Sequence, residues 1–116
     1  MSSFGGRFQA GNRLKRPEEF KLVFSSKQQR SKDRTFLFIT RDNGIDQARL
    51  GLAVPKKHIS KAVDRNRLKR IIREGFRTRK RQLAGKDIVV VVKSSLDINT
   101  KTVGSSLIKH WEKICK

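Results

Sequence analysis

The sequence predicts one small α+β domain, an α-β sandwich in which helices pack on a β-sheet. Three observations favour this fold class. The chain has 116 residues, the length of one ordinary domain. Residues 88–92 read Ile-Val-Val-Val-Val without alternation, as expected of a strand that is covered on both faces. On both sides of that run, apolar residues recur at helical spacing. The expected order is α-β-β-α-β-α, with room for a third strand before the second helix.

The first half of the chain predicts an arm, a helix and two strands. Residues 1–12 hold three glycines and no periodicity, so we interpret them as a mobile basic arm before a domain that spans 13–116. Residues 16–26 place a proline just inside a helix start and two acids in its first turn. Residues 35–41 are β-branched and aromatic, and a turn-rich loop separates them from 48–55. We expect these two strands to pair as an antiparallel hairpin.

The second half predicts a long helix, a strand and a final helix. Ser60 is a candidate N-cap and Gly85 a candidate C′ residue, and a helix of about 22 residues between them would span roughly 33 Å. Residues 87–93 form the apolar strand, for which a crossover pair with 48–55 is one option. The last helix, capped by Asn99 or Thr100, carries one apolar stripe made of Val103, Leu107, Trp111 and Ile114.

The charge of the chain points to a polyanionic partner. The formal net charge is +19 and the pI is about 11.4, which indicates nucleic acid before an anionic membrane surface. The longest apolar run is far shorter than the roughly 20 residues that cross a bilayer. The polar, glycine-rich start of the chain does not resemble a secretion signal. Cys115 is the only cysteine, which excludes an intramolecular disulfide and fits a reducing cytoplasm.

Residues 61–81 concentrate this charge, with ten lysines and arginines in twenty-one positions. At 100° per residue, a core stripe forms from Leu68, Ile71, Ile72, Gly75 and Phe76. The outer face then holds Asn66, Lys69, Arg70, Arg73 and Arg77, with Arg65 and Arg67 on its two shoulders. Guanidinium groups grip phosphates with two hydrogen bonds, and an asparagine can read a base edge or a 2′-hydroxyl. The alternative is an ordinary solvated face, although such faces usually mix both signs of charge.

The acidic residues do not predict a catalytic site in the protein. Two-metal hydrolysis of a phosphodiester needs clustered carboxylates, and the ten acids here are scattered. His58 and His110 lack acids or cysteines at ligand spacing, while Asp64 and Glu74 are expected to balance local charge. We therefore expect no catalytic residue and no metal held by the protein. A structural ribosomal protein without a substrate groove and a self-sufficient nuclease are the rival interpretations.

Several motifs together resemble the bacterial ribonuclease P protein subunit. Residues 61–77 look like the signature of that family, with its Arg-Asn-Arg core at Arg65, Asn66 and Arg67. The similarity extends through 12–24, 49–58, the strand at 87–93 and the C-terminal helix. It covers nearly the whole chain with the motifs in family order. An isolated Arg-Asn-Arg would be weak evidence, whereas the full set is specific.

The resemblance implies a fold, partners and a division of labour. The fold would contain an unusual left-handed βαβ crossover, as in the second domain of the fifth small-subunit ribosomal protein, although right-handed connections prevail in general. The protein would join one catalytic RNA in a cytoplasmic ribonucleoprotein that removes the 5′ leader from precursor tRNA. Mg²⁺ bound by that RNA would perform the chemistry. The catalytic RNA would bind Arg65, Asn66, Arg67, Lys69, Arg70, Arg73 and Arg77.

The resemblance also implies a groove for the single-stranded leader between the first helix and the sheet. Such a groove needs aromatic faces for bases and cations for phosphates. The candidate residues are Arg13, Lys15, Phe20, Phe24, Phe36, Phe38, Lys56 and Lys57. Phe36 and Phe38 share one face of their strand, and the sequence leaves open whether that face lines the groove or the core. Pro55 departs from the small residue common in the family, which removes one backbone donor.

Overall fold

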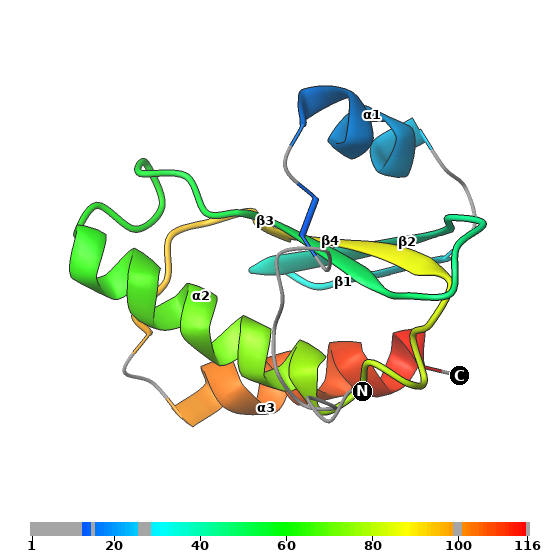
Figure 1. Cartoon of the computed structure of the whole chain (residues 1–116). Helices are drawn as coiled ribbons and strands as arrows, with labels where there is room; N and C mark the ends of the chain where they lie inside the picture. Colours follow the sequence, from blue (N-terminus) through cyan, green and yellow to red (C-terminus); the bar gives the residue numbers. More distant parts are fainter. Residues whose placement is uncertain (1–12, 15, 26–28, 99–100, 116) are drawn as a thin grey trace.

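The computed structural model describes residues 13–14, 16–25, 29–98 and 101–115. In that part of the chain, three helices and four strands follow the order α1-β1-β2-β3-α2-β4-α3 (Figure 1). The elements are α1 Pro17–Ser25, β1 Gln29–Lys32, β2 Phe36–Asp42, β3 Arg49–Ala53, α2 Ala62–Arg77, β4 Lys86–Val92 and α3 Lys101–Ile114. The predicted α+β class is confirmed. The expected arm at 1–12 and the caps at Asn99 or Thr100 lie outside the described residues.

The four strands form one mixed sheet in the order β1-β2-β4-β3. β4 is antiparallel to β2 and parallel to β3. The predicted hairpin between 35–41 and 48–55 is therefore wrong, because β4 lies between those two strands. The unbroken apolar run of β4 is best buried where helices cover both faces of the strand and other strands pair with both of its edges. Only the interior of the sheet provides such a position. The crossover pair is confirmed, since α2 connects the parallel strands β3 and β4.

β1 precedes the two strands that the sequence predicted in this half of the chain, whereas the optional extra strand was expected after them. β1 forms an edge of the sheet and pairs antiparallel with β2. Its sequence, Gln-Arg-Ser-Lys, carries no apolar residue, and only Ser31 is buried. Hydrogen bonding to β2, rather than a hydrophobic pattern, makes this segment a strand. A polar edge strand also resists pairing with other chains.

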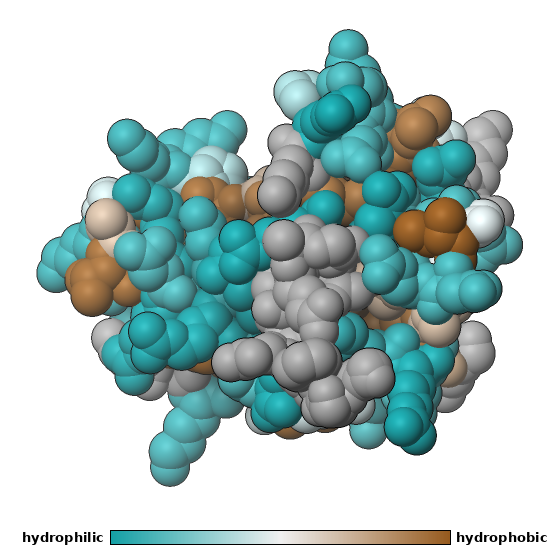
Figure 2. Space-filling model, in the orientation of Figure 1, coloured by the Kyte–Doolittle hydropathy of each residue, from teal (hydrophilic) through white to brown (hydrophobic). Residues whose placement is uncertain are grey.

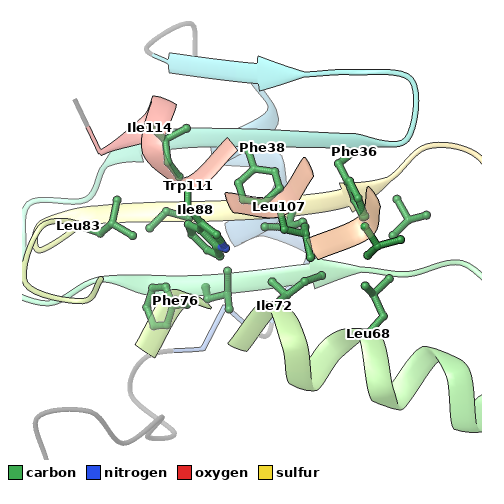
Figure 3. Close-up of a cluster of buried hydrophobic side chains, with 14 of the residues drawn as sticks. Phe36, Phe38, Leu68, Ile72, Phe76, Leu83, Ile88, Leu107, Trp111 and Ile114 are labelled. Atoms are coloured by element: carbon green, nitrogen blue, oxygen red, sulfur yellow. The ribbon is translucent and has the colours of Figure 1, made fainter. Parts of the chain in front are cut away.

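The helices cover the sheet from both sides, α1 on one face and α2 with α3 on the other (Figure 1). The main core lies between the sheet and α2 and α3, where Leu68, Ile72, Phe76 and Trp111 are buried (Figure 3). The predicted stripe on the last helix, Val103, Leu107, Trp111 and Ile114, is buried as expected. A smaller cluster under α1 joins Leu14 and Val23 to the opposite face of β2 and β4.

α2 is shorter than the sequence predicted. It ends at Arg77, and Thr78 is its C-cap residue. Hydrogen-bonded turns then lead through the buried Leu83 to Gly85, whose φ of +84° suits glycine. At its start the N-cap residue is Lys61 rather than Ser60, and no side chain caps the helix. Ile71 is 38% exposed, so the buried stripe is narrower than expected.

Candidate nucleic-acid interface

One face of α2 gathers polar and basic side chains around an open hollow of about 500 Å³. Its lining is Arg13, Asn66, Lys69, Arg70, Arg73 and Glu74. The four α2 residues from Asn66 to Arg73 follow i, i+3, i+4, i+7 spacing, which places them on one side of a helix. Where α2 is visible in Figure 2, most of its side chains are hydrophilic. We call this surface the helix face.

A second hollow, of about 330 Å³, lies between α1, β3 and α2. Its lining is Arg13, Leu14, Phe20, Leu50, Leu52, Lys69 and Arg73. It combines the aromatic ring of Phe20 with three cations, the composition that a single RNA strand requires. Arg13, Lys69 and Arg73 line both hollows. The second hollow, which we call the α1 groove, therefore adjoins the helix face.

The ring of Phe20 packs closely over Gly51 of β3. A Cβ atom on Gly51 of β3 would come within 2.7 Å of the Phe20 ring. The ring is half-buried, so one side packs on the strand while the rest faces the α1 groove. Phe24 is 40% exposed, and it is absent from the lining of both hollows. The structure thus brings Phe20, but not Phe24, together with the groove cations.

Phe36 and Phe38 are not groove residues. Both rings are buried in the main core, 1% and 0% exposed, on the face of β2 that packs against α3 (Figure 3). Phe38 stacks on His110 with ring centroids 4.9 Å apart and meets the edge of Trp111 at the same distance. The prediction that they line the groove is wrong. The other face of β2 lies under α1 and carries Leu37 and Ile39.

The cations where the two hollows meet lie close enough to influence one another. Burial lowers the pKa of the Arg73 guanidinium, and the charge of Arg13 lowers that pKa further. Arginine stays protonated in proteins. Both side chains therefore keep their positive charge, and Arg13 and Arg73 repel each other. A phosphate placed between them would relieve that repulsion. The charges of Arg13 and Arg73 therefore oppose each other where the two hollows meet.

The remaining predicted cations have different positions. Arg65 is half-buried and donates to the backbone carbonyls of Ile59 and Ser60. Arg67 is exposed, and Arg77 is paired with Glu74 at 2.8 Å. Lys56 and Lys57 are exposed on the turn after β3, which rises on the α1 side of the sheet in Figure 1. Neither lysine lines the two hollows. Lys15 lies outside the described residues.

The sequence interpretation missed the ion-pair network that fastens α1. Arg49 of β3 donates to both carboxylate oxygens of Asp87, each at 2.8 Å, and to Glu19 of α1 at 2.9 Å. The hydrogen bond to Asp87 raises the pKa of Arg49 against the opposing effect of burial. The sequence signal for this network was Asp87, which directly precedes the apolar run at 88–92. A carboxylate buried beside such a run needs a hydrogen-bonding or charged partner. This network holds α1 beside the groove.

A second missed network surrounds His110. His110 lies 2.9 Å from Asp33, and Ser31 lies 2.5 Å from its other ring nitrogen. Ser106 and the amides of Thr35 and Phe36 also donate to Asp33. Burial raises the pKa of Asp33, but these hydrogen bonds outweigh it and hold the pKa well below its ordinary value. The network joins α3 to the β1–β2 turn.

Four acids of the described residues take part in local structure. Asp33, Asp87, Glu19 and Glu74 accept hydrogen bonds or form ion pairs. Within the described part of the chain, no group of three or more His, Cys, Asp or Glu side chains could hold a metal ion. None of the described helices has the length and apolar character needed to cross a membrane.

Comparison with known proteins identifies the family. The family model for ribonuclease P matches residues 8–115. The ribonuclease P protein component of Pseudomonas putida (strain GB-1) is 38% identical over 110 residues, which are 94% of this chain and 82% of that protein. The RNase P protein of Staphylococcus aureus has a similar structure, with a TM-score of 0.75 at 34% identity over 90% of this chain and 95% of the other.

A second similar structure is the RNase P protein of Thermotoga maritima. Its TM-score is 0.62 at 32% identity, over 88% of this chain and 90% of the other. The residues that the family model matches include those of both the helix face and the α1 groove. The chain therefore belongs to the ribonuclease P family, as a protein component of the ribonucleoprotein enzyme that removes the 5′ leader from precursor tRNA.

Proposed function

We propose that the helix face binds the catalytic RNA of ribonuclease P and that the α1 groove binds the 5′ leader of precursor tRNA. The observation that carries this proposal is the set of cations, Arg13, Lys69 and Arg73, that lines both hollows. Two RNA strands bound on adjoining surfaces would share these cations. A structural ribosomal protein has no need of an aromatic ring in such a groove.

The groove suits a single strand better than a duplex. Phe20 is a half-buried ring in the lining of the groove, and Leu50 and Leu52 are apolar side chains of β3 in the same lining. Base stacking on an aromatic ring tolerates any sequence, because every base has a π-face. The leaders of different precursor tRNAs differ in sequence, so this mode of binding fits a common substrate site.

Catalysis in this proposal belongs to the RNA, whose bound Mg²⁺ supplies the metal-ion chemistry. In the described part of the chain, no three His, Cys, Asp or Glu side chains group closely enough to hold a metal ion. Glu19, Asp87, Asp33 and Glu74 are already paired with Arg49, His110 or Arg77. The protein contributes positive charge where RNA strands would otherwise repel one another. It thereby raises substrate affinity and lowers the magnesium concentration that the enzyme requires.

Reconstitution tests this proposal. The protein is mixed with the ribonuclease P RNA of its own organism, and precursor tRNAs with leaders of zero, two, five and ten nucleotides are added at low magnesium. We expect the protein to bind the RNA, and substrate affinity to rise with leader length until the groove is filled. Affinity that is independent of leader length would contradict the groove assignment. Cleavage by protein free of RNA would contradict the division of labour.

A further inference from the structure

The segment between β3 and α2 is fastened by one side chain from α2. Arg65 Nη1 donates to the carbonyl of Ile59 at 3.1 Å and to the carbonyl of Ser60 at 2.8 Å. This nitrogen carries two N–H groups, so each carbonyl can receive one of them. That end of the guanidinium is engaged with the backbone just ahead of the helix.

The start of α2 depends on this contact. Lys61 occupies the N-cap position, and it makes no side-chain cap hydrogen bond. The chain ahead of the helix is instead held by Arg65 and by Ile59, whose side chain is buried in the main core. On the other side, the amides of His58 and Ile59 both donate to the carbonyl of Pro55.

These contacts enclose Lys56 and Lys57 in a turn that is fixed at both ends. Pro55 restricts the backbone on one side because its ring limits φ. Arg65 fixes the other side through Ile59 and Ser60. Two exposed lysines at the tip of such a turn keep their backbone position while their ammonium groups reach into solvent. A pre-ordered turn loses less entropy when it binds a phosphate chain.

We propose that Arg65 is a positioning residue for Lys56 and Lys57, and that its main effect is on binding of the 5′ leader. This inference rests on the proposed function and deepens it. It assigns Arg65, the first arginine of the Arg-Asn-Arg motif, to leader binding rather than to the helix face. Arg65 is absent from the lining of the hollow on that face, whereas Arg70 lines it. The two arginines therefore act on different RNA strands.

The first measurement uses the free protein and needs no RNA. Backbone ¹⁵N relaxation is recorded for wild type, Arg65→Ala, Arg65→Lys and the control Arg70→Ala. Arg65→Ala should increase the fast motion of the amides from Lys56 to Ser60, and Arg70→Ala should leave them unchanged. Arg65→Lys should give an intermediate result, because one ammonium group can reach a carbonyl but lacks the planar fork.

The second measurement is a double-mutant cycle in the holoenzyme. The leader advantage is defined as the ratio of the Kd values for leaderless tRNA and for precursor tRNA with a long leader. Arg65→Ala alone should reduce this ratio by at least about threefold, within the range of couplings between interacting residues. In a background of Lys56→Ala with Lys57→Ala, the same change should reduce it by less than about twofold. Arg70→Ala should weaken assembly with the catalytic RNA and leave the leader advantage unchanged.

The outcomes separate this inference from the proposed function. If wild type shows no leader advantage, the groove assignment fails. If wild type shows the advantage but the two lysine changes do not reduce it, these lysines do not contact the leader and the inference about Arg65 is wrong. If the lysines matter but Arg65→Ala leaves either the turn dynamics or the leader advantage unchanged, positioning by Arg65 is wrong. Equal losses from Arg65→Ala with and without the lysines would mean that its guanidinium contacts phosphate independently. Coupled losses together with a mobile turn would support the inference.

Discussion

Arg49 and Asp87 face each other across the parallel strands β3 and β4 and form an ion pair through two hydrogen bonds of 2.8 Å. Asp87 is fully buried, and Asn43 also donates to it. The same guanidinium reaches Glu19 in α1. One arginine thus ties two strands and the groove helix together, so groove geometry and fold stability depend on the same residue.

Replacing Asp87 by Asn should destabilise the domain strongly. The change leaves the charge of Arg49 without its buried partner, and breaking a buried pair in this way typically costs about 3–5 kcal/mol. Urea denaturation followed by circular dichroism measures the effect. Asp46→Asn, at an exposed position, is the matched control and should change stability little. Equal stability of the two variants would mean that the pair contributes no net stability.

The network around Asp33 predicts how the free energy of unfolding falls at acidic pH. The pKa of Asp33 is lowered in the folded state, so its stabilising effect is present above the ordinary aspartate pKa of about 3.9 and is lost as pH falls below it. Denaturation of wild type and Asp33→Asn between pH 6 and pH 2 tests this. Wild type should be the more stable protein at pH 6, and the difference should shrink as the solution is acidified. A constant difference would exclude titration of Asp33 as its cause.

Phe20 and Phe38 should respond differently to the same truncation. Phe38→Ala opens a cavity in the main core and should cost roughly 3–5 kcal/mol of stability. Phe20 is half-buried at the α1 groove, so Phe20→Ala should cost less stability. It should instead lose on the order of 1–3 kcal/mol of affinity per stacked base, and only for substrates with a leader. Melting temperatures and holoenzyme affinities for long-leader and leaderless tRNA distinguish the two effects. A large loss of stability in Phe20→Ala, with both RNAs affected alike, would mean that this ring serves the fold.

Removing one phosphate-binding cation from the helix face should change the salt dependence of binding. Arg70→Ala is expected to weaken binding to the catalytic RNA and to flatten the plot of log affinity against log salt by about 0.7 to 0.9 units. Affinity measured by filter binding at several salt concentrations gives the slope. Asp42→Asn, an exposed change outside both hollows, provides a control for nonspecific effects. Weaker binding with an unchanged slope would place Arg70 outside the interface.

Two helical glycines predict opposite effects of alanine. At Gly75 of α2 a Cβ atom would collide with the indole Nε1 of Trp111, so Gly75→Ala should destabilise the domain by about 1–3 kcal/mol. At Gly104 of α3 nothing lies within 4 Å of the added atom. Gly104→Ala should therefore stabilise the helix by up to about 1 kcal/mol. Thermal denaturation measures both variants, and the same sign for both would contradict the predicted packing.

Local patterns in the sequence predicted the parts of the fold that depend on local interactions. The apolar stripe from Val103 to Ile114 and the double-sided burial of the strand at 87–93 are properties of neighbouring residues. Strand order is not such a property. Whether residues 35–41 pair with 48–55 or with 87–93 is decided by competition among all strands for the centre of the sheet. The polar strand β1 carried no hydrophobic signal at all.

The candidate site was predicted unevenly for the same reason. Helical spacing was enough to bring Asn66, Lys69, Arg70 and Arg73 to one hollow. Alternation also showed that Phe36 and Phe38 share a face, but it could not tell which face α1 covers. The contact between Arg65 and the carbonyls of Ile59 and Ser60 depends on how the chain turns before the helix. No residue pattern encodes that turn.

The central place of β4 has a consequence for synthesis on the ribosome. A chain emerging from its N-terminus exposes β2, β3 and α2 before the strand that joins them exists. Until residues 86–92 have left the exit tunnel, β2 and β3 have no common neighbour, and the core that needs Trp111 waits even longer. During that interval the basic segment of α2 is already outside, next to ribosomal RNA. The basic face of α2 is therefore available to polyanions before the sheet is complete.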